Sequence, residues 1–233
     1  MNKRLKFTAQ IAMAGVSALL LSACFGQPDV KRNKKQDRPS TTQKAPPPRG
    51  AVPAFSTQDS RACLVSLQQA SVRYDALDNQ YFGGGCSAID SVKLLDIGVP
   101  VSNLGAMTCP LARNFSAWAQ YAVRPAARQF FGAEVVKIET MGTYACRNIN
   151  GASSGRLSQH ASANAIDVSA FVLSDGRRIT VTKDWQGDRK AQDFLRALHK
   201  SACRRFGTVL GPDYNRAHHD HFHFEMNGNG FCR

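Results

Sequence analysis

Residues 158–171 read SQHASANAIDVSAF, a polar turn followed by a run of small and apolar residues that carries one acid. The run from Ala165 to Phe171 predicts a buried strand, because its side chains are apolar or small almost throughout. Asp167 lies in the middle of it. A carboxylate at a buried position is costly unless it is paired or binds a cation, so the sequence predicts a partner for Asp167.

A second polar strand is expected near the C-terminus, where four of the six histidines fall within HHDHFH at residues 218–223. The alternation from His219 to Met226 predicts a strand. On such a strand one face would carry His219, His221, His223 and Glu225, and the core face would carry Phe222, Phe224 and Met226. Alternate side chains lie about 7 Å apart along a strand, so His221 and His223 are expected to face one site.

His160, Asp167 and His223 together supply two nitrogens and one oxygen. That set suits a catalytic zinc ion, which has three protein ligands and an open fourth position. Taken singly, each residue has a simpler interpretation: a histidine on an exposed strand is usually an ordinary surface residue, and Asp167 could pair with an arginine. His199 lies on a helix rich in Lys and Arg with no matched neighbour, and we interpret it as structural.

The other patterns mix helices and strands without regular alternation, which indicates an α+β fold. Helical periodicity predicts helices over 57–70 and 191–202 and a further helix with Leu111, Phe115, Trp118 and Ala122 on one face. Pro125 should kink or divide that helix. Strands are predicted at 91–97, 134–140 and 179–182, the last as a hairpin partner of the strand that carries Asp167.

The cysteines indicate disulfides in an exported chain. Seven are present. Setting Cys24 aside leaves an even number, which allows three disulfides in any of about 15 connectivities; these are Cys63, Cys86, Cys109, Cys146, Cys203 and Cys232. A Cys203–Cys232 bond, which would tie the C-terminal tail to the last helix, is the first pair we expect. Oxidised cysteines cannot act as nucleophiles, so a cysteine hydrolase is disfavoured.

Residues 1–23 have the three-part pattern of a signal peptide: a basic start, an apolar run from Ile11 to Leu21, and small residues after it. The ending LSAC at 21–24 resembles a bacterial lipobox, which implies that Cys24 is diacylated and becomes the first mature residue. The alternative is an ordinary signal peptide that leaves Cys24 as a free thiol. No aspartate follows Cys24, and by the same resemblance we expect a periplasmic protein held to the outer membrane by its N-terminal lipid.

Residues 24–56 are rich in Pro, Lys, Arg, Gln, Ser and Thr and show no apolar periodicity, which is typical of a solvated tether. Residues 1–52 hold ten bases and two acids, and therefore +8 of the net charge of +13. The remaining chain, 57–233, is expected to be the folded domain, because a content of 43% hydrophobic residues is globular. An exported chain with no basic stripe interleaved with aromatics is not expected to bind nucleic acid.

Two family resemblances rest on these residues. The chain resembles the D-Ala-D-Ala carboxypeptidase, murein endopeptidase and Hedgehog-like zinc peptidases at two motifs. Their Ser-x-His-(x)6-Asp motif resembles Ser158-Gln159-His160 through Asp167, and their His-x-His motif resembles His221-Phe222-His223. The family usually has Gly at the position of Ala163. A longer resemblance, from about Ala62 to Glu225, is to the extensin-like protein C-terminal family. It covers TCPLA at 108–112, YACR at 144–147, SQHA at 158–161, NAIDV at 164–168, FGTVLGP at 206–212 and HHDHFH at 218–223.

The peptidase resemblance implies a small, mainly antiparallel sheet flanked by helices and a role for each motif residue. It implies that His160, Asp167 and His223 bind Zn²⁺, that His221 is the acid/base group, and that His218 matches an additional histidine of murein endopeptidases. Arg147 would hold a substrate carboxylate or the developing oxyanion, although a surface arginine beside a disulfide is an equally good interpretation. Ser158 and Glu225 are expected behind the ligands as hydrogen-bond partners; a glutamate base is the alternative for Glu225.

The implied function is metal-assisted hydrolysis of peptide bonds in peptidoglycan by a lipoprotein whose tether reaches the wall. The alternative is a lipoprotein that binds the wall, or serves there as a scaffold, without turnover. A serine hydrolase with Ser154 or Ser158 beside His160 is disfavoured, because a serine in Ser-x-His is better interpreted as a hydrogen-bond partner of the site.

Overall fold

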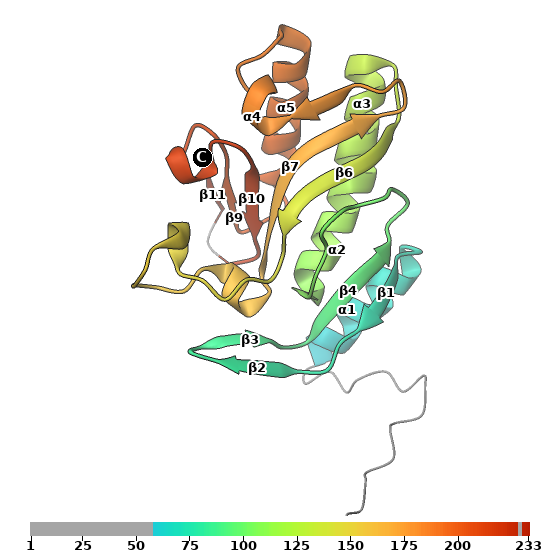
Figure 1. Ribbon diagram of the computed structural model, residues 1–233. Helices are drawn as coiled ribbons and strands as arrows, with labels where there is room; N and C mark the ends of the chain where they lie inside the picture. The colour runs from blue at the N-terminus through green and yellow to red at the C-terminus, as the bar shows by residue number, and fades with distance from the viewer. Residues whose placement is uncertain (1–57, 228–229) are drawn as a thin grey trace, which may run out of the picture. The chain divides into compact units, whose positions relative to one another are not determined.

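Strand β7 (Ala165–Leu173) lies inside the main sheet of the computed structural model, which describes residues 58–227 and 230–233 (Figure 1). The sheet order is β11-β9-β10-β7-β6, with β8 also paired to β7. Its other strands are β6 (Val135–Gly142), β8 (Arg178–Thr180), β9 (Thr208–Leu210), β10 (Phe222–Glu225) and β11 (Phe231–Cys232). All pairings are antiparallel except β11 with β9. The residues 228–229 and 1–57 are not described, so the expected signal peptide (1–23) and the tether (24–56) lie outside the described residues.

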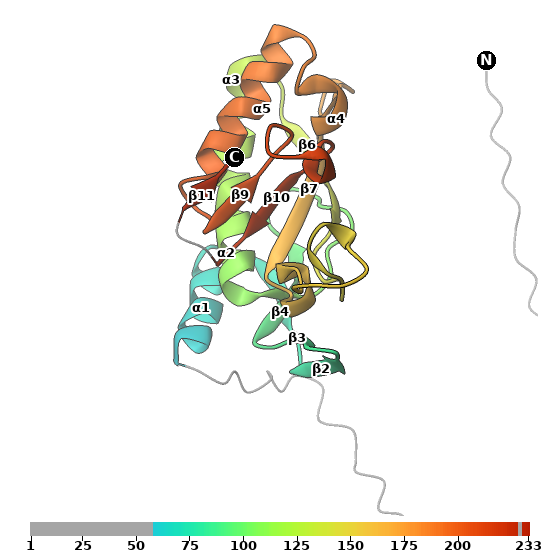
Figure 2. The same ribbon diagram turned by 90° about the vertical axis from the view of Figure 1, so that its left-hand side faces the viewer.

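Helices cover one face of this sheet. They are α2 (Cys109–Trp118), a π-helical segment (Ala119–Val123), α3 (Arg124–Phe131), the short α4 (Val181–Asp184) and α5 (Arg189–Ala202). Figure 2 shows α3 and α5 side by side. Pro125 is the second residue of α3, directly after the π-helical segment, and the backbone is right-handed helical on both sides of it. The helix is therefore not divided at this proline as expected; it changes from π-helical to α-helical type at Arg124.

The covered face of the sheet is packed with aromatic rings. Trp118 of α2 lies edge-on to Phe224 of β10, with ring centroids 5.0 Å apart, and Phe171 of β7 is 5.5 Å from Phe194 of α5. The indole N–H of Trp118 donates to the Leu198 carbonyl oxygen. Because side chains alternate along a strand, Phe222 and Phe224 point into this core and the residue between them, His223, points to the opposite face.

A smaller layer comes first in the chain. Helix α1 (Gln58–Gln69) is followed by β1 (Arg73–Ala76), which pairs with β4 (Ser91–Asp96), and β4 pairs with β5 (Met107–Thr108). A separate hairpin of β2 (Gln80–Gly83) and β3 (Cys86–Ala88) projects beside it (Figure 1). Within the described residues no helix is long and apolar enough to span a membrane.

The α+β class is confirmed, with two corrections to the expected strands. The strand predicted for 219–226 spans only Phe222–Glu225: Asn215 caps a 3-10 turn at Arg216–His218, and His219 is exposed with Nδ1 2.8 Å from the Arg216 carbonyl oxygen. His219 therefore does not share a strand face with His223. The strand predicted for 179–182 ends at Thr180, because the Thr180 hydroxyl accepts a hydrogen bond from the Lys183 N–H and starts α4.

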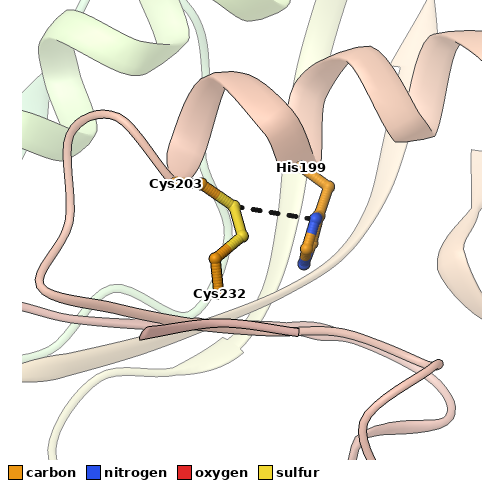
Figure 3. Close-up of side chains that lie close together, drawn as sticks. All are labelled: His199, Cys203 and Cys232. Atoms are coloured by element: carbon orange, nitrogen blue, oxygen red, sulfur yellow. Dashed lines mark hydrogen bonds between the residues drawn. A yellow bond between two sulfur atoms is a disulfide. The ribbon is translucent and has the colours of Figure 1, made fainter. Parts of the chain in front are cut away.

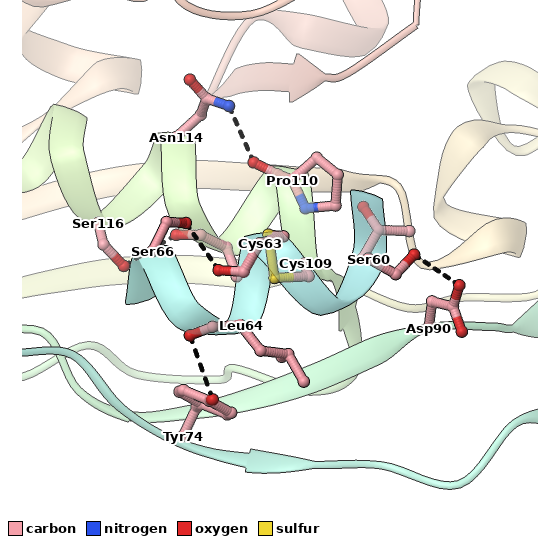
Figure 4. Close-up of a disulfide and its surroundings, with 12 residues drawn as sticks. Ser60, Cys63, Leu64, Ser66, Tyr74, Asp90, Cys109, Pro110, Asn114 and Ser116 are labelled. Atoms are coloured by element: carbon pink, nitrogen blue, oxygen red, sulfur yellow. Dashed lines mark hydrogen bonds between the residues drawn. A yellow bond between two sulfur atoms is a disulfide. The ribbon is translucent and has the colours of Figure 1, made fainter. Parts of the chain in front are cut away.

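Three disulfides are formed, as predicted, and they include the expected Cys203–Cys232 bond. The other two join Cys63 to Cys109 and Cys86 to Cys146. Figure 4 shows the first of these two joining α1 to the beginning of α2. Cys86–Cys146 joins the β2–β3 hairpin to the segment that follows β6, and so fixes the chain immediately before Arg147.

Removing the Cys63–Cys109 disulfide by replacing both residues with Ser is expected to lower the free energy of unfolding by about 2 to 5 kcal/mol, because the bond closes a 46-residue separation in the unfolded chain. Urea unfolding of the variant beside the wild type measures this change. Six reactive thiols in the denatured, unreduced wild-type protein would contradict the assignment.

Candidate metal centre

Three elements bring two histidines and an aspartate together on the open face of the main sheet. His160 lies on a 3-10 turn (Gln159–Ser162), Asp167 lies on β7, and His223 lies directly opposite Asp167 on β10. All three are buried, with exposed fractions of 2%, 4% and 6%. The expected burial of Asp167 among potential partners is thus observed.

The donor atoms of these three residues have the spacing of a metal site. His160 Nε2 is 3.2 Å from His223 Nδ1 and 3.0 Å from an Asp167 carboxylate oxygen, and His223 Nδ1 is 2.8 Å from the other oxygen. Donors held about 2.0–2.1 Å from a tetrahedral zinc ion lie roughly 3.3 Å from one another. The donor set and its spacing therefore fit a zinc ion with little movement.

Hydrogen bonds fix which ring nitrogen of each histidine is available. His160 Nδ1 lies 2.5 Å from the Thr143 carbonyl oxygen, which can only accept, so this nitrogen carries a proton and Nε2, which faces Asp167 and His223, is the nitrogen that a metal would take. On His223 the arrangement is reversed: Nε2 is 3.2 Å from Glu225 Oε2, so Nδ1, which lies 2.8 Å from Asp167 Oδ1, is the nitrogen that a metal would take in place of a proton. Partners of this kind orient metal-binding histidines and raise their basicity. Glu225 thus lies behind a candidate ligand, and its hydrogen bond to His223 is the kind of contact that was expected for it.

The electrostatics of the cluster favour positive charge between the three groups. Burial opposes ionisation of Asp167, but hydrogen bonds from His160 and His223 outweigh it and hold the pKa of the carboxyl well below its usual range. Burial likewise opposes protonation of His223, and its hydrogen bonds to Asp167 and Glu225 raise its pKa to about 9. A cation bound here would occupy the position that the proton on His223 now favours.

His221 lies beside these three donors but outside β10, in the residue before the strand. Its Nδ1 is 2.8 Å from Asp220 Oδ1, and its Nε2 is 3.5 Å from the Asp167 carboxylate. The Asp220 contact places the ring proton on Nδ1, so Nε2 is left as a proton acceptor directed at the site. Asp220 was not singled out from the sequence, although a carboxylate beside a histidine is a pattern that could have revealed it.

His218 reaches the same cluster from the turn before His221. Its ring centroid is 5.2 Å from that of His221 and 5.6 Å from that of His223. Burial lowers its pKa to about 4, and the charges of the neighbouring histidines act in the same direction. Asn215 Oδ1 lies 2.8 Å from His218 Nδ1 and orients the ring. His218 is therefore a neutral imidazole at neutral pH.

Arg147 and Ser158 both lie at this site, on the two arms of a short antiparallel loop in which the Ser158 N–H donates to the Arg147 carbonyl oxygen. The Arg147 guanidinium is 3.1 Å from Asp167 Oδ2. Ser158 accepts a hydrogen bond at its hydroxyl from the His160 N–H and so caps the turn that carries His160. Arg147 is more than a surface residue beside a disulfide, because it contacts a candidate ligand.

Ala163, where the peptidase motif usually has Gly, ends the same turn in a left-handed conformation with a φ of 55°. Gly adopts this conformation without the penalty that a Cβ brings, which gives a physical reason for the family preference. The turn is nevertheless closed, because the Ala163 N–H donates to the His160 carbonyl oxygen.

A cleft of about 250 Å³ opens beside the candidate metal-binding residues. His218, His223 and Glu225 form its inner end. One wall is the loop of residues 149–159, and the other comes from β9, Tyr214, Asn227 and Phe231. Of the three candidate metal-binding residues, His223 is the one that lines this cleft.

His199 and the sulfur atoms of Cys203 and Cys232 lie together at the end of α5, but they do not form a comparable metal site. His199 Nδ1 is 3.8 Å from Cys203 Sγ, and Cys203 is bonded to Cys232 (Figure 3). The His199 ring also packs against Trp185 and Phe222. His199 thus has close neighbours, contrary to expectation. Both sulfurs are joined in a disulfide and are not free thiolates for a metal. The packing of the His199 ring supports the structural role predicted for this residue.

The fold and the donor set define a mixed α+β domain with a candidate metal centre on the open face of its sheet. The chain belongs to the extensin-like protein family, since the model of the extensin-like protein C-terminus matches residues 61–233. No curated protein and no solved structure matches the chain.

Proposed function

We propose that this protein is a zinc-dependent peptidase that hydrolyses peptide bonds in the stem peptides or cross-links of peptidoglycan. The convergence of His160 Nε2, His223 Nδ1 and the Asp167 carboxylate, whose two oxygens lie 3.0 and 2.8 Å from these nitrogens, carries this proposal. The motif resemblance to D-Ala-D-Ala carboxypeptidases, murein endopeptidases and Hedgehog-like zinc peptidases supports it, and a peptidase-like arrangement of the sheet and helices is part of the proposal.

His160, Asp167 and His223 would hold the metal. When bound, zinc supplies a Lewis acid that polarises a carbonyl group and lowers the pKa of a water molecule. His221 accepts a proton at Nε2, because Asp220 holds the Nδ1 proton and keeps the ring directed at the site. It then returns that proton to the leaving amine, as a general acid.

The neighbouring residues prepare the site for this role. His218 stays neutral and adds no charge to compete with the metal. Arg147 places its positive charge beside Asp167, where it can also stabilise negative charge that develops on a carbonyl oxygen. Glu225 and the Thr143 carbonyl keep the two ligand rings in the tautomers that a metal requires.

We propose peptidoglycan as the substrate because of the cellular location that the N-terminal sequence predicts and because of the chemistry of the site. The lipobox at 21–24 and the basic tether to residue 56 would leave the domain attached to the outer membrane and within reach of the wall. Incubation of the zinc-loaded protein with purified muropeptides, followed by mass spectrometry, tests the activity. Products that appear with zinc and disappear after chelation support it. Retention on muropeptides with no product at any metal content would favour a wall-binding or scaffold protein.

Replacing Cys24 by Ala is expected to release the protein from the membrane fraction into the soluble periplasmic fraction, because no other lipid attachment site is proposed. Fractionation and acyl-chain analysis of both forms measure this. A wild-type chain that is membrane-bound without an acyl group on Cys24 would contradict the lipoprotein assignment.

A further inference from the structure

The cleft beside the metal-binding residues is rich in unused hydrogen-bond donors. Arg156 lines it, and within the described part of the chain its guanidinium forms no ion pair. The Gln159 side-chain oxygen accepts from the Asn164 amide, so its NH₂ group points its protons elsewhere. The Ser158 hydroxyl oxygen accepts from the His160 N–H, so its own proton is available. A ligand of this cleft must therefore bring acceptors.

Negative charge is scarce in the same cleft. Its one carboxylate, Glu225, already accepts a hydrogen bond from His223 Nε2. Arg156 is the one lysine or arginine among the residues that line the cleft. An arginine binds a carboxylate with two parallel hydrogen bonds, which makes a carboxylate the natural acceptor for this position.

The segment that carries Arg156 is fixed at both ends. The Ile149 N–H donates to the Arg156 carbonyl oxygen, and Asn148 and Leu157 form a β-bridge. The Cys86–Cys146 disulfide holds one end of the loop, and the turn that bears His160 holds the other. Arg156 is thus presented to the cleft from a backbone whose position is tied to that of the metal-binding residues.

Arg147 is differently placed, because its guanidinium lies 3.1 Å from the Asp167 carboxylate. Its charge is already balanced by a candidate metal ligand. We propose that Arg156, and not Arg147, binds a carboxylate of the substrate peptide in this cleft, with Gln159 and Ser158 as additional donors. The inference rests on the proposed function for the identity of the peptide. It makes Arg156 a specificity-determining residue that selects acidic peptides.

Titration calorimetry tests this with two synthetic stem pentapeptides, one with free carboxylates and one with all carboxylates amidated. The protein is the zinc-loaded full chain with His221→Ala, which removes the proposed proton acceptor. Adding Arg156→Gln is expected to weaken binding of the acidic peptide by about tenfold to hundredfold, the usual worth of a hydrogen bond to a charged group. Binding of the amidated peptide should change by less than about twofold, on the same reasoning.

Arg204→Gln is the matched control, because Arg204 is an exposed arginine after α5 that does not line the cleft. It should leave both affinities unchanged, and Arg156→Lys should restore part of the loss. Equal affinity of the parent and Arg156→Gln proteins for the acidic peptide, equal losses for both peptides, or no binding to the parent would overturn the inference. Carboxylate-selective binding without hydrolysis by the wild type would instead contradict the proposed function alone.

Discussion

Replacing His160, Asp167 or His223 by Ala is expected to reduce zinc affinity by at least about 10²-fold and to remove activity with it. Loss of an outer hydrogen-bond partner of a ligand already costs about 10- to 100-fold, and each of these substitutions removes a donor that lies about 3 Å from the other two. Elemental analysis of the purified variants and muropeptide cleavage rates measure the two effects.

His219→Ala is the matched control for the histidine variants. His219 belongs to the same cluster in the sequence but is exposed and bonded to the Arg216 carbonyl oxygen. It should keep full zinc content and activity. Asp167→Asn, which preserves the shape of the side chain, separates metal loss from a failure to fold. Retention of zinc by all three Ala variants would contradict the ligand assignment.

His221→Ala is expected to lower turnover by about 10² to 10⁴ while the protein keeps its zinc, since this is the usual contribution of a general acid or base. Steady-state kinetics on zinc-loaded protein give the effect on kcat. Asp220→Asn should lower kcat by less, because it removes the group that holds the Nδ1 proton but leaves the ring in place. Metal loss in His221→Ala equal to that in His223→Ala would make His221 a ligand.

The parts of the fold that follow from local periodicity could be predicted from the sequence. The apolar faces of α2 and α5 repeat at the period of a helix, and β7 is recognisable as a short continuous run of buried residues. The strand at the C-terminus was predicted too long, because alternation continues through His219 even though Asn215 caps a turn there. A cap can override alternation where the two signals overlap.

The candidate site was predictable only as far as side-chain chemistry is visible in the sequence. Asp167 stands out as a charge in a buried strand, and the His-x-His pattern marks His223. The Thr143 oxygen that orients the His160 ring belongs to the backbone, and every residue has such a carbonyl oxygen. Its role depends on tertiary packing that no local pattern encodes. The pairing of Cys63 with Cys109 was likewise one of many connectivities that the sequence allowed.

Only the structure shows which ring nitrogen of His160 and of His223 is directed at the candidate metal site. The two candidate ligand histidines look alike in the sequence, yet His160 directs Nε2 and His223 directs Nδ1 at the candidate site. The difference arises because a carbonyl oxygen lies at one ring and a carboxylate at the other. Only the folded chain sets these partners.

X-ray absorption at the zinc edge of the purified wild-type protein tests the central claim most directly. Two imidazoles and further nitrogen or oxygen donors at about 2.0–2.1 Å, with no sulfur, are the predicted result. This corresponds to His160, His223 and Asp167 with an open position for solvent. Three imidazoles would mean that His221 or His218 also binds the metal, and a protein that takes up no zinc would contradict the account as a whole.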